Sequence, residues 1–327
     1  MEKILTVAIP SYNVSKYLDE ILPTFLCDEI MNDIEILIVN DGSKDNTAEI
    51  ASRYEEEYKG VIRLINKENG GHGSTINRGI EEAKGKYFKV VDGDDWVDSK
   101  EFIRYVEALK NIDADAILTP FNRVNIENGE IIKKDFLRLK HGTIYKVDGI
   151  ICEISHKYQM HSITFKSEIL KKIPKIRENC FYVDQEYVNY PLKYIDTIAY
   201  LECTIYQYRV GNNEQSISFK NMQKNRNMHM NVFFDILSFY EDNTFSKSVT
   251  DFLIERLSGL YLTQMRIFFS MDINNETKKE LSNFTNKVKM KNRKLYSQIP
   301  GKKMLLMRIT NNMLYPMMAR HAQRERN

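Results

Sequence analysis

The sequence predicts an α/β fold, with a mostly parallel sheet flanked by helices and a helical C-terminal extension. Through the first hundred residues, apolar strand-like runs alternate with helical stretches, a pattern typical of βαβ units. The strand-like runs are almost continuously apolar, which indicates a sheet that is covered by helices on both faces. Beyond residue 219 the pattern is helical almost throughout.

The predicted elements of the first half follow from apolar periodicity and from turn residues. Four strands are expected, at residues 4–9, 34–39, 61–65 and 86–91. The helices between them are expected at 14–26, 46–58 and 74–84, with Ser15 capping the first. A helix at 99–109, a strand at 114–118 and a hairpin at 121–139 that turns at Asn128-Gly129 come next.

The second half starts with mixed elements and ends in helices. Between residues 145 and 208 we expect a short helix, three strands and a helix that begins near Asp184. Helices are then predicted at 221–240, 246–269, 275–288 and 302–320, and Pro316 is expected to kink or interrupt the last one. We place the domain boundary between residues 218 and 219, so that residues 1–218 form one domain and 219–327 a helical region.

Composition narrows the class of protein. The 327 residues are 43% apolar and 28% charged, as in ordinary soluble globular proteins, and hold no apolar run long enough to span a membrane. The chain begins directly with a strand, so no signal peptide is expected. Its four cysteines are scattered without a metal-binding spacing, which favours reduced thiols and a cytoplasmic location.

One stretch, Lys86–Asp98, combines a buried strand with an acidic turn. Its strand part is aromatic or β-branched apart from Lys89, and it ends in Asp92-Gly93-Asp94-Asp95. Carboxylates this close repel one another unless a cation or donor is near. Mg²⁺ and Mn²⁺ prefer such oxygen ligands together with substrate phosphates. The alternative is a solvated Asp-Gly turn.

Polar clusters follow four strands of the predicted sheet. They are Ser11-Tyr12-Asn13, Asp41-Gly42-Ser43, the glycine-rich loop 68–73 and Asp92-Gly93-Asp94. The carboxyl ends of parallel strands meet at one edge of a sheet, where open α/β sheets bind their ligands. The sequence therefore predicts a metal–diphosphate site of a bound nucleotide at this edge.

These motifs resemble the family 2 glycosyltransferases, which are inverting enzymes with the GT-A fold, a Rossmann-like nucleotide-binding sheet. The resemblance covers about residues 4–218 and is most specific in the first hundred. The segments that carry it are TVAIPSYN at 6–13, EILIVNDGSKDNT at 35–47, NGG at 69–71, NRG at 77–79 and VDGDDW at 91–96. Their order and spacing, more than any single motif, make the match specific.

The resemblance implies a role for each matching residue. Asp41 is expected against the uracil ring of a UDP-sugar, with Pro10, Ser11, Tyr12 and Asn13 lining the same pocket. Asn77 matches a donor-contacting Asn, although Ile76 replaces the Arg usual before it. Glycines let a backbone approach a diphosphate or ribose closely. That reason applies to Gly70, Gly71 and Gly73, and Gly93 lies between two donor-site acids.

The acidic turn matches the family's DxD motif. By that match Asp94 is the metal ligand, Asp92 shares the cation or contacts the ribose, and Asp95 supports the turn. The implied cofactor is Mn²⁺ or Mg²⁺, which would offset charge on the departing diphosphate. The family's second acidic motif corresponds to FYVDQEY at 181–187, with Val183 in place of its Glu.

Asp184 is therefore the candidate general base, with a capping aspartate as the alternative and Glu186 as the fallback.

Arg209 could face the diphosphate, since a guanidinium suits phosphate oxygens. Residues 215–218 resemble the end of the family's catalytic region. Of the histidines, His72 is placed to reach a phosphate or sugar, and His161 to line an acceptor cleft; a structural role is the alternative for both.

The implied function is transfer of a hexosyl or N-acetylhexosaminyl group from a nucleoside diphosphate sugar, UDP favoured, to a hydroxyl of a growing or lipid-linked glycan. Two alternatives remain. One is a non-catalytic nucleotide-sugar-binding partner of a synthase complex. The other is a sugar-phosphate nucleotidyltransferase, which is disfavoured because Pro10–Asn13 stands where that family has a glycine-rich loop.

The tail has a different charge from the rest of the chain. Residues 287–327 hold eleven Lys or Arg against the single acid Glu325, so they carry +10 and the preceding 286 residues −8. Methionines and leucines interleave these cations at 302–320, which predicts a basic amphipathic helix. It either rests on an anionic membrane, such as the inner face of the plasma membrane, or packs on the body or in a homodimer. Nucleic acid is disfavoured, since no binding module is present.

Overall fold

The structure is a computed structural model that describes residues 3–211 and 219–324. It divides into two compact units, one of residues 1–212 and 245–249 and the other of residues 213–244 and 250–327. The division near 212 lies close to the predicted boundary at 218, and residue 218 itself falls outside the described residues. Residues 245–249 group with the first unit although they lie in the predicted helical region.

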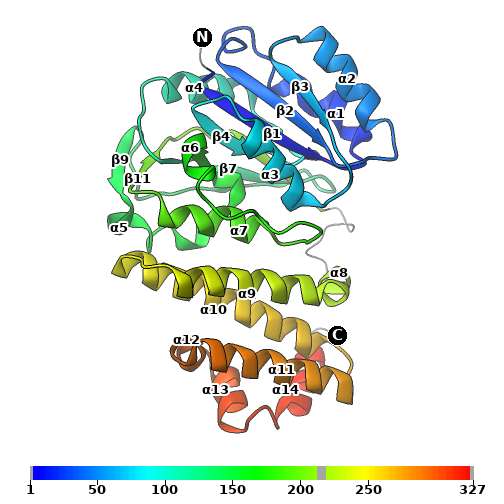
Figure 1. Cartoon of the computed structure of the whole chain (residues 1–327), viewed down its shortest axis with the longest axis vertical. Helices are drawn as coiled ribbons and strands as arrows, with labels where there is room; N and C mark the ends of the chain where they lie inside the picture. Colours follow the sequence, from blue (N-terminus) through cyan, green and yellow to red (C-terminus); the bar gives the residue numbers. More distant parts are fainter. Residues whose placement is uncertain (1–2, 212–218, 325–327) are drawn as a thin grey trace. The chain divides into compact units, whose positions relative to one another are not determined.

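An eight-stranded sheet forms the centre of the first unit (Figure 1). The strands from β3 through β2 and β1 to β4 pair in parallel, and β11 is parallel to β6. β10 is antiparallel to β4 and β6, and β9 to β11. In sheet order the strands are β3 Ile62–Asn66, β2 Ile34–Asn40, β1 Leu5–Ser11, β4 Tyr87–Val90, β10 Ile163–Lys166, β6 Ala116–Leu118, β11 Thr197–Tyr200 and β9 Thr143–Lys146.

Helices cover both faces of this sheet. Leu5, Val7 and Ile9 of β1 share one core cluster with α1, α2 and α4. On the other face α3 packs on β1 and β2, where Gly79 lies against Ala8 and Phe88. The helices of the unit are α1 Ser15–Ile21, α2 Thr47–Glu57, α3 His72–Glu82, α4 Ser99–Leu109, α5 Val147–Ile150, α6 Ser167–Leu170 and α7 Asp184–Asn189. Its short 3-10 helices are η1 Leu22–Thr24, η2 Ser155–Lys157, η3 Met160–Ser162 and η4 Tyr190–Lys193.

A second, four-stranded sheet lies in the same unit. Its order is β5 Trp96–Val97, β12 Tyr206–Val210, β7 Phe121–Asn125 and β8 Ile131–Lys134. β7 and β8 form the hairpin predicted to turn at Asn128-Gly129. β5 directly follows the acidic turn, and its pairing with β12 ties that turn to residues far along the chain.

Some helix predictions differ from the structure in detail. The helix expected at 14–26 ends at Ile21 and is followed by the 3-10 helix η1, whose second residue is Pro23. Ser15 makes no side-chain cap; its N–H donates instead to Asp45 at 3.0 Å. The helix expected at 302–320 is interrupted before Pro316, where Asn311 and Asn312 adopt left-handed φ values of 46° and 68°.

The described part of the second unit is helical. Its elements are α8 Phe219–Lys224, α9 Arg226–Asp242, α10 Lys247–Ser270, α11 Asn275–Lys291, α12 Arg293–Gln298, α13 Lys302–Ile309 and α14 Tyr315–Arg324. Aromatic contacts join α9, α10 and α11 through Phe233, Tyr261 and Phe284. Within the described ranges the structure has no helix that is both long and apolar enough to cross a membrane.

Candidate active site

The ends of β1, β2 and β4 bring the predicted polar clusters to one edge of the sheet. The N–H of Asp41, after β2, donates to the carbonyl of Ser11, the last residue of β1, at 2.8 Å. Gly93, after β4, lies so close to the loop after β1 that an added Cβ would be 2.7 Å from the Pro10 carbonyl oxygen. The acidic turn can therefore reach this position only because residue 93 is glycine.

The loop after β1 is fixed by the loop after β2. Asn13 adopts a φ of 54°, and its side-chain oxygen accepts from the N–H of Lys44 at 2.8 Å. The N–H of Asn13 donates to Ser43 at 3.0 Å. Ser11 is buried, whereas Tyr12 is 50% exposed. Of the predicted pocket residues in this loop, Tyr12 is thus the one whose ring is presented to solvent.

The carboxylate of Asp41 is occupied by the glycine-rich loop. It accepts from the backbone N–H of Gly70 at 2.9 Å and of Gly71 at 2.8 Å. Lys67 Nζ lies 2.6 Å away, and Ser74 Oγ is 3.3 Å away. Asp41 is only 3% exposed. The predicted contact with uracil stays a prediction, and in this structure Asp41 holds the loop that follows β3.

The glycines of this loop make room for another part of the chain. An added Cβ on Gly73 would be 2.1 Å from the carbonyl oxygen of Arg177, and one on Gly71 would be 3.2 Å from Asn179. The close backbone approach expected for a diphosphate is made here by residues 176–180. For Gly73 the structure therefore gives a different physical reason for glycine than the one predicted.

Asn77 also serves this contact. Its amide nitrogen donates to the carbonyl of Ile176 at 2.8 Å, and its oxygen accepts from the N–H of the same residue at 2.9 Å. It is 7% exposed. The neighbouring Arg78 pairs with Glu81 and Glu82 on the helix surface. Neither side chain is directed at a ligand site by the contacts it makes.

The acidic turn is anchored at Asp95. Tyr206 donates its hydroxyl to Asp95 Oδ2 at 2.7 Å, and the N–H of Arg209 donates to Oδ1 at 2.7 Å. The Arg209 side chain donates to the backbone carbonyl of Asp94 at 2.6 Å and lies over Trp96 at 4.7 Å. Asp95 supports the turn as predicted. Arg209, expected at a diphosphate, instead holds the turn together from β12.

Asp92 and Asp94 are half-buried, and they lie close to each other's negative charge. Burial, followed by the charge of Asp92, raises the pKa of Asp94. Burial and the charges of Asp94 and Asp92 raise the pKa of Asp95 well above its ordinary value. The pKa of Asp92 is lowered instead, because the charge and hydrogen bond of His72 outweigh its burial. Asp94 and Asp95 are thus the carboxylates held near other negative charge in a partly desolvated place, which is the condition that a bound cation relieves.

His72 links the acidic turn to Asp184. Its Nε2 is 2.9 Å from Asp92 Oδ1. Burial works against the charged imidazole, but the charge and hydrogen bond of Asp92 outweigh it and raise the pKa of His72. The charge of Asp184 acts in the same direction. His72, the first residue of α3, therefore lies within electrostatic reach of two acids from distant segments.

Asp184 is the first residue of α7, and Val183 occupies the cap position. Its carboxylate accepts from the side chain of Gln185 at 2.8 Å. The fallback base, Glu186, is fully buried and accepts from the N–H of Arg177 at 2.7 Å. Of the two predicted bases, Asp184 is the one that is not enclosed by the protein.

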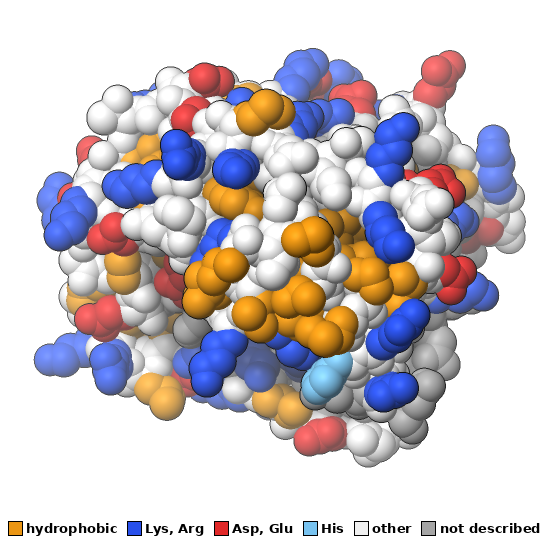
Figure 2. Space-filling model, turned by 90° about the horizontal axis from the view of Figure 1, so that it is seen from below, with side chains coloured by type: hydrophobic (Ala, Val, Ile, Leu, Met, Phe, Trp, Pro, Cys, Tyr) orange, Lys and Arg blue, Asp and Glu red, His pale blue; other side chains and the backbone are white. Residues whose placement is uncertain are grey.

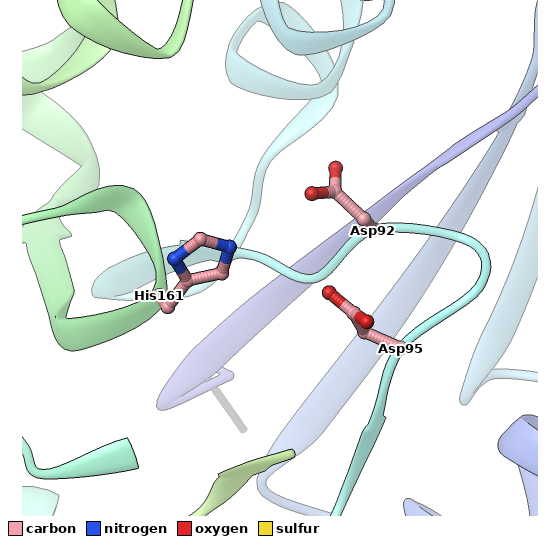
Figure 3. Close-up of side chains that lie close together, drawn as sticks. All are labelled: Asp92, Asp95 and His161. Carbon is pink, nitrogen blue, oxygen red and sulfur yellow. The ribbon is translucent and has the colours of Figure 1, made fainter. Parts of the chain in front are cut away.

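Figure 3 shows a group that the sequence did not predict as a unit: Asp92, Asp95 and His161. One ligand atom from each lies within 4.8 Å of the others. The His161 ring packs between Tyr208, at 4.2 Å, and Tyr206, at 4.8 Å between ring centres. Its Nδ1 is buried and has no hydrogen-bond partner among the described residues. Burial lowers the pKa of His161 to about 4, so the ring is neutral and can offer a lone pair.

Comparison with known proteins identifies the family. The model of glycosyl transferase family 2 matches residues 6–173, about half of the chain. The chain belongs to glycosyl transferase family 2. The predicted family is thereby confirmed, and with it the class of glycosyltransferase enzymes. Residues 215–218, which also resemble the family, lie outside the described residues.

Curated members of this family align with the N-terminal part of the chain. The uncharacterized glycosyltransferase EpsJ of Bacillus subtilis is 38% identical over 117 residues, which are 36% of this chain and 33% of EpsJ. The glycosyltransferase GlyG of Streptococcus pneumoniae is 34% identical over 130 residues, 39% of this chain and 42% of GlyG. The chain thus matches well under half the length of these relatives.

Solved structures confirm the predicted GT-A fold with its helical extension. S. aureus TarS 1–349 in complex with UDP superposes with a TM-score of 0.68 at 18% identity, covering 98% of this chain and 88% of that one. The mannosyltransferase PcManGT from Pyrobaculum calidifontis, in complex with GDP-Man and Mn²⁺, gives a TM-score of 0.53 at 13% identity. It covers 99% of this chain and 87% of that chain.

The fold family implies a divalent cation, and the residues of the acidic turn fit one. Asp92 and Asp94 offer carboxylate oxygens in a place where negative charge is in excess. A ring nitrogen of His161 lies within 4.8 Å of a carboxylate oxygen of Asp92 and of Asp95. Carboxylate oxygens suit both Mn²⁺ and Mg²⁺. Asp94, the ligand that the sequence predicts, is not part of the three-residue group, so two overlapping ligand sets share Asp92.

Proposed function

We propose that this protein transfers a sugar from a nucleoside diphosphate sugar to an acceptor hydroxyl with inversion, and that it depends on a divalent cation. One observation carries the proposal: the acidic turn after β4 keeps an excess of negative charge at the carboxyl edge of the sheet. Asp184, a second acid, acts on the same histidine from another segment. A cation site and a general base near the same residue, His72, supply the two groups that such a displacement requires.

The donor is proposed to be a UDP-sugar carrying a hexosyl or N-acetylhexosaminyl group. The similarity to TarS, which has been solved with UDP and with UDP-GlcNAc, supports a uridine nucleotide. The similarity to PcManGT, solved with GDP-Man and Mn²⁺, supports a metal-assisted reaction on a related fold. The proposed acceptor is a hydroxyl of a growing or lipid-linked glycan.

In the proposed mechanism the protein positions two acids against the donor and the acceptor. Asp94 and Asp92 would hold the cation, which would supply Lewis-acid stabilisation of the leaving diphosphate. Arg209 and Tyr206 keep the turn fixed through Asp95 and the Asp94 carbonyl. Asp184 takes the proton of the attacking hydroxyl, and the amide of Gln185 orients its carboxylate. Tyr12, whose side chain is half exposed, is proposed to contact the nucleotide base.

A donor panel tests this function. The full chain is incubated with UDP-glucose, UDP-galactose, their N-acetyl forms, GDP-mannose and dTDP-glucose, each with Mn²⁺ or with EDTA. We expect one UDP-sugar to be bound and slowly hydrolysed, with release of UDP only when Mn²⁺ is present. Equal hydrolysis with and without metal, or no binding of any donor, would contradict the proposal. The fold is checked in parallel by circular dichroism.

A further inference from the structure

Five large apolar side chains stand exposed on the last two helices. They belong to α13, to the connection after it and to α14, and we call them the α13–α14 patch. Its members are Leu305 (49% exposed), Leu306 (41%), Ile309 (71%), Met313 (78%) and Met317 (55%). Figure 2 shows apolar side chains gathered on the face seen from below, where α13 and α14 lie in Figure 1.

Packing within the unit accounts for other residues of the same helices. Met304, Met307 and Met318 are buried, and the Tyr315 hydroxyl donates to the carbonyl of Phe268 at 3.0 Å. The break at Asn311 and Asn312 reverses the chain between the two helices. The amphipathic stretch is thus divided: one set of apolar residues fixes the helices to the unit, and the patch remains on the outside.

The charges around the patch are of one sign. From Lys287 to Arg324 the sequence contains no Asp or Glu. Lys302, Lys303 and Arg320 are exposed on the two helices that carry the patch. Figure 2 shows Lys and Arg side chains bordering the apolar group, with acidic side chains farther out. A partner for this face must therefore offer an apolar interior and a negatively charged surface at the same time.

A cavity of about 560 Å³ adjoins the patch. Leu262, Met265 and Phe269 of α10 and Met304 of α13 give it apolar walls. Arg266, Lys302 and Lys303 also line it. An apolar cavity with cations in its wall matches a lipid, whose acyl chain is apolar and whose phosphate is anionic. α13 contributes to both features, with Met304 turned to the cavity and Leu305 and Leu306 exposed.

We propose that the α13–α14 patch and its adjoining cavity dock on the surface of a lipid bilayer that contains anionic lipids. Leucine and methionine side chains enter the boundary between headgroups and acyl chains, and the surrounding lysines and arginines bind lipid phosphates. A protein partner, including a second copy of this chain, would bury the patch but would have to supply matching acids. This inference goes beyond the proposed transfer reaction and does not depend on it.

Cosedimentation with vesicles tests the docking. The full chain is mixed with vesicles of phosphatidylcholine alone or with one third phosphatidylglycerol, in low and in high salt. We expect binding to the anionic vesicles, weakened about tenfold when NaCl rises from about 0.1 M to about 0.5 M. Equal binding to both vesicle types, or none to either, would overturn the proposal.

Three variants separate the patch, the charges and nonspecific effects. Leu305→Asp/Ile309→Asp and Lys302→Glu/Lys303→Glu are each expected to reduce binding about tenfold or more. Leu137→Asp is the control, since Leu137 is 87% exposed in the other unit and is expected to leave binding unchanged. If the wild type is a dimer that Leu305→Asp/Ile309→Asp dissociates, and vesicles are not bound, the patch is a protein interface and the proposal fails.

Discussion

Two loops at the same edge of the sheet, the glycine-rich loop after β3 and the acidic turn after β4, differ in how their polar groups are satisfied. Around the glycine-rich loop, Asp41 of the loop after β2 accepts from two backbone N–H groups and pairs with Lys67, and Asn77 of α3 binds both backbone polar groups of Ile176. In the acidic turn, burial and neighbouring charge raise the pKa values of Asp94 and Asp95. The polar groups around the glycine-rich loop are bound by the protein itself, whereas Asp94 and Asp95 of the acidic turn lie close to other negative charges.

This difference distinguishes residues that stabilise the site from residues that are expected to act on the cation, donor or acceptor. A polar group that is satisfied by its own chain contributes to stability, whereas a charge held in an unfavourable place is retained for what it binds. We therefore expect changes in the glycine-rich loop to lower the free energy of unfolding. Changes in the acidic turn or at Asp184 are expected to lower turnover while the fold persists.

The largest effect is expected for Asp184→Asn. A positioned general base is worth about 10² to 10⁴ in rate, so kcat should fall by that factor. The amide has the same shape and can still bond to Gln185, so the melting temperature should stay within a few degrees of wild type. Transfer assays and thermal unfolding measure the two quantities. Near-wild-type turnover would remove Asp184 from the mechanism.

Gly73→Ala is expected to lower stability the most. The added Cβ would be 2.1 Å from the Arg177 carbonyl oxygen, so residues 176–180 must move away from α3. Overpacking of this kind costs about 3 kcal/mol. Gly149→Ala is the matched control, since Gly149 is helical with nothing within 4 Å of the added Cβ. It should be neutral or stabilise by about 0.5 kcal/mol. Urea denaturation of both variants measures the difference.

Asp41→Asn tests the loop from its other side and should have a smaller effect. The amide cannot accept from Gly70, Gly71 and Lys67 together, because one of its two oxygen positions becomes a donor. Loss of such bonds costs about 2 kcal/mol of the free energy of unfolding. Unchanged stability with a large loss of UDP affinity would show that Asp41 binds the nucleotide. The contrast between the glycine-rich loop and the acidic turn would then be wrong.

The sequence predicted the sheet edge well, because strands and the turns after them are local patterns. β4, α4 and the β7–β8 hairpin lie within a few residues of their predicted positions. The partners across that edge were not predictable, because they are distant in the sequence. Asn77 meets Ile176 across 99 positions, and nothing in the local pattern of either residue indicates that pairing.

The same limit explains the metal site. The spacing of Asp92, Asp94 and Asp95 indicates a cation, but it does not show which carboxylate another segment will occupy. Tyr206 and Arg209 donate hydrogen bonds to Asp95. His161, which belongs to η3, packs against two aromatic rings. The sequence predicted His161 at an acceptor cleft, with a structural role as the alternative, and gave no indication that it lies beside the acidic turn. The position of His161 depends on the pairing of β10 with β4 and on the contact between β12 and the acidic turn.

The central claim is that the acidic turn binds a divalent cation together with the donor diphosphate, and Asp94→Asn tests it most directly. UDP binding is measured by calorimetry for wild type and variant, with Mn²⁺ and with EDTA. The account predicts that Mn²⁺ strengthens UDP binding to the wild type and has little effect on the variant, while thermal unfolding of the two proteins is similar. Equal strengthening by Mn²⁺ in Asp94→Asn and wild type would contradict it.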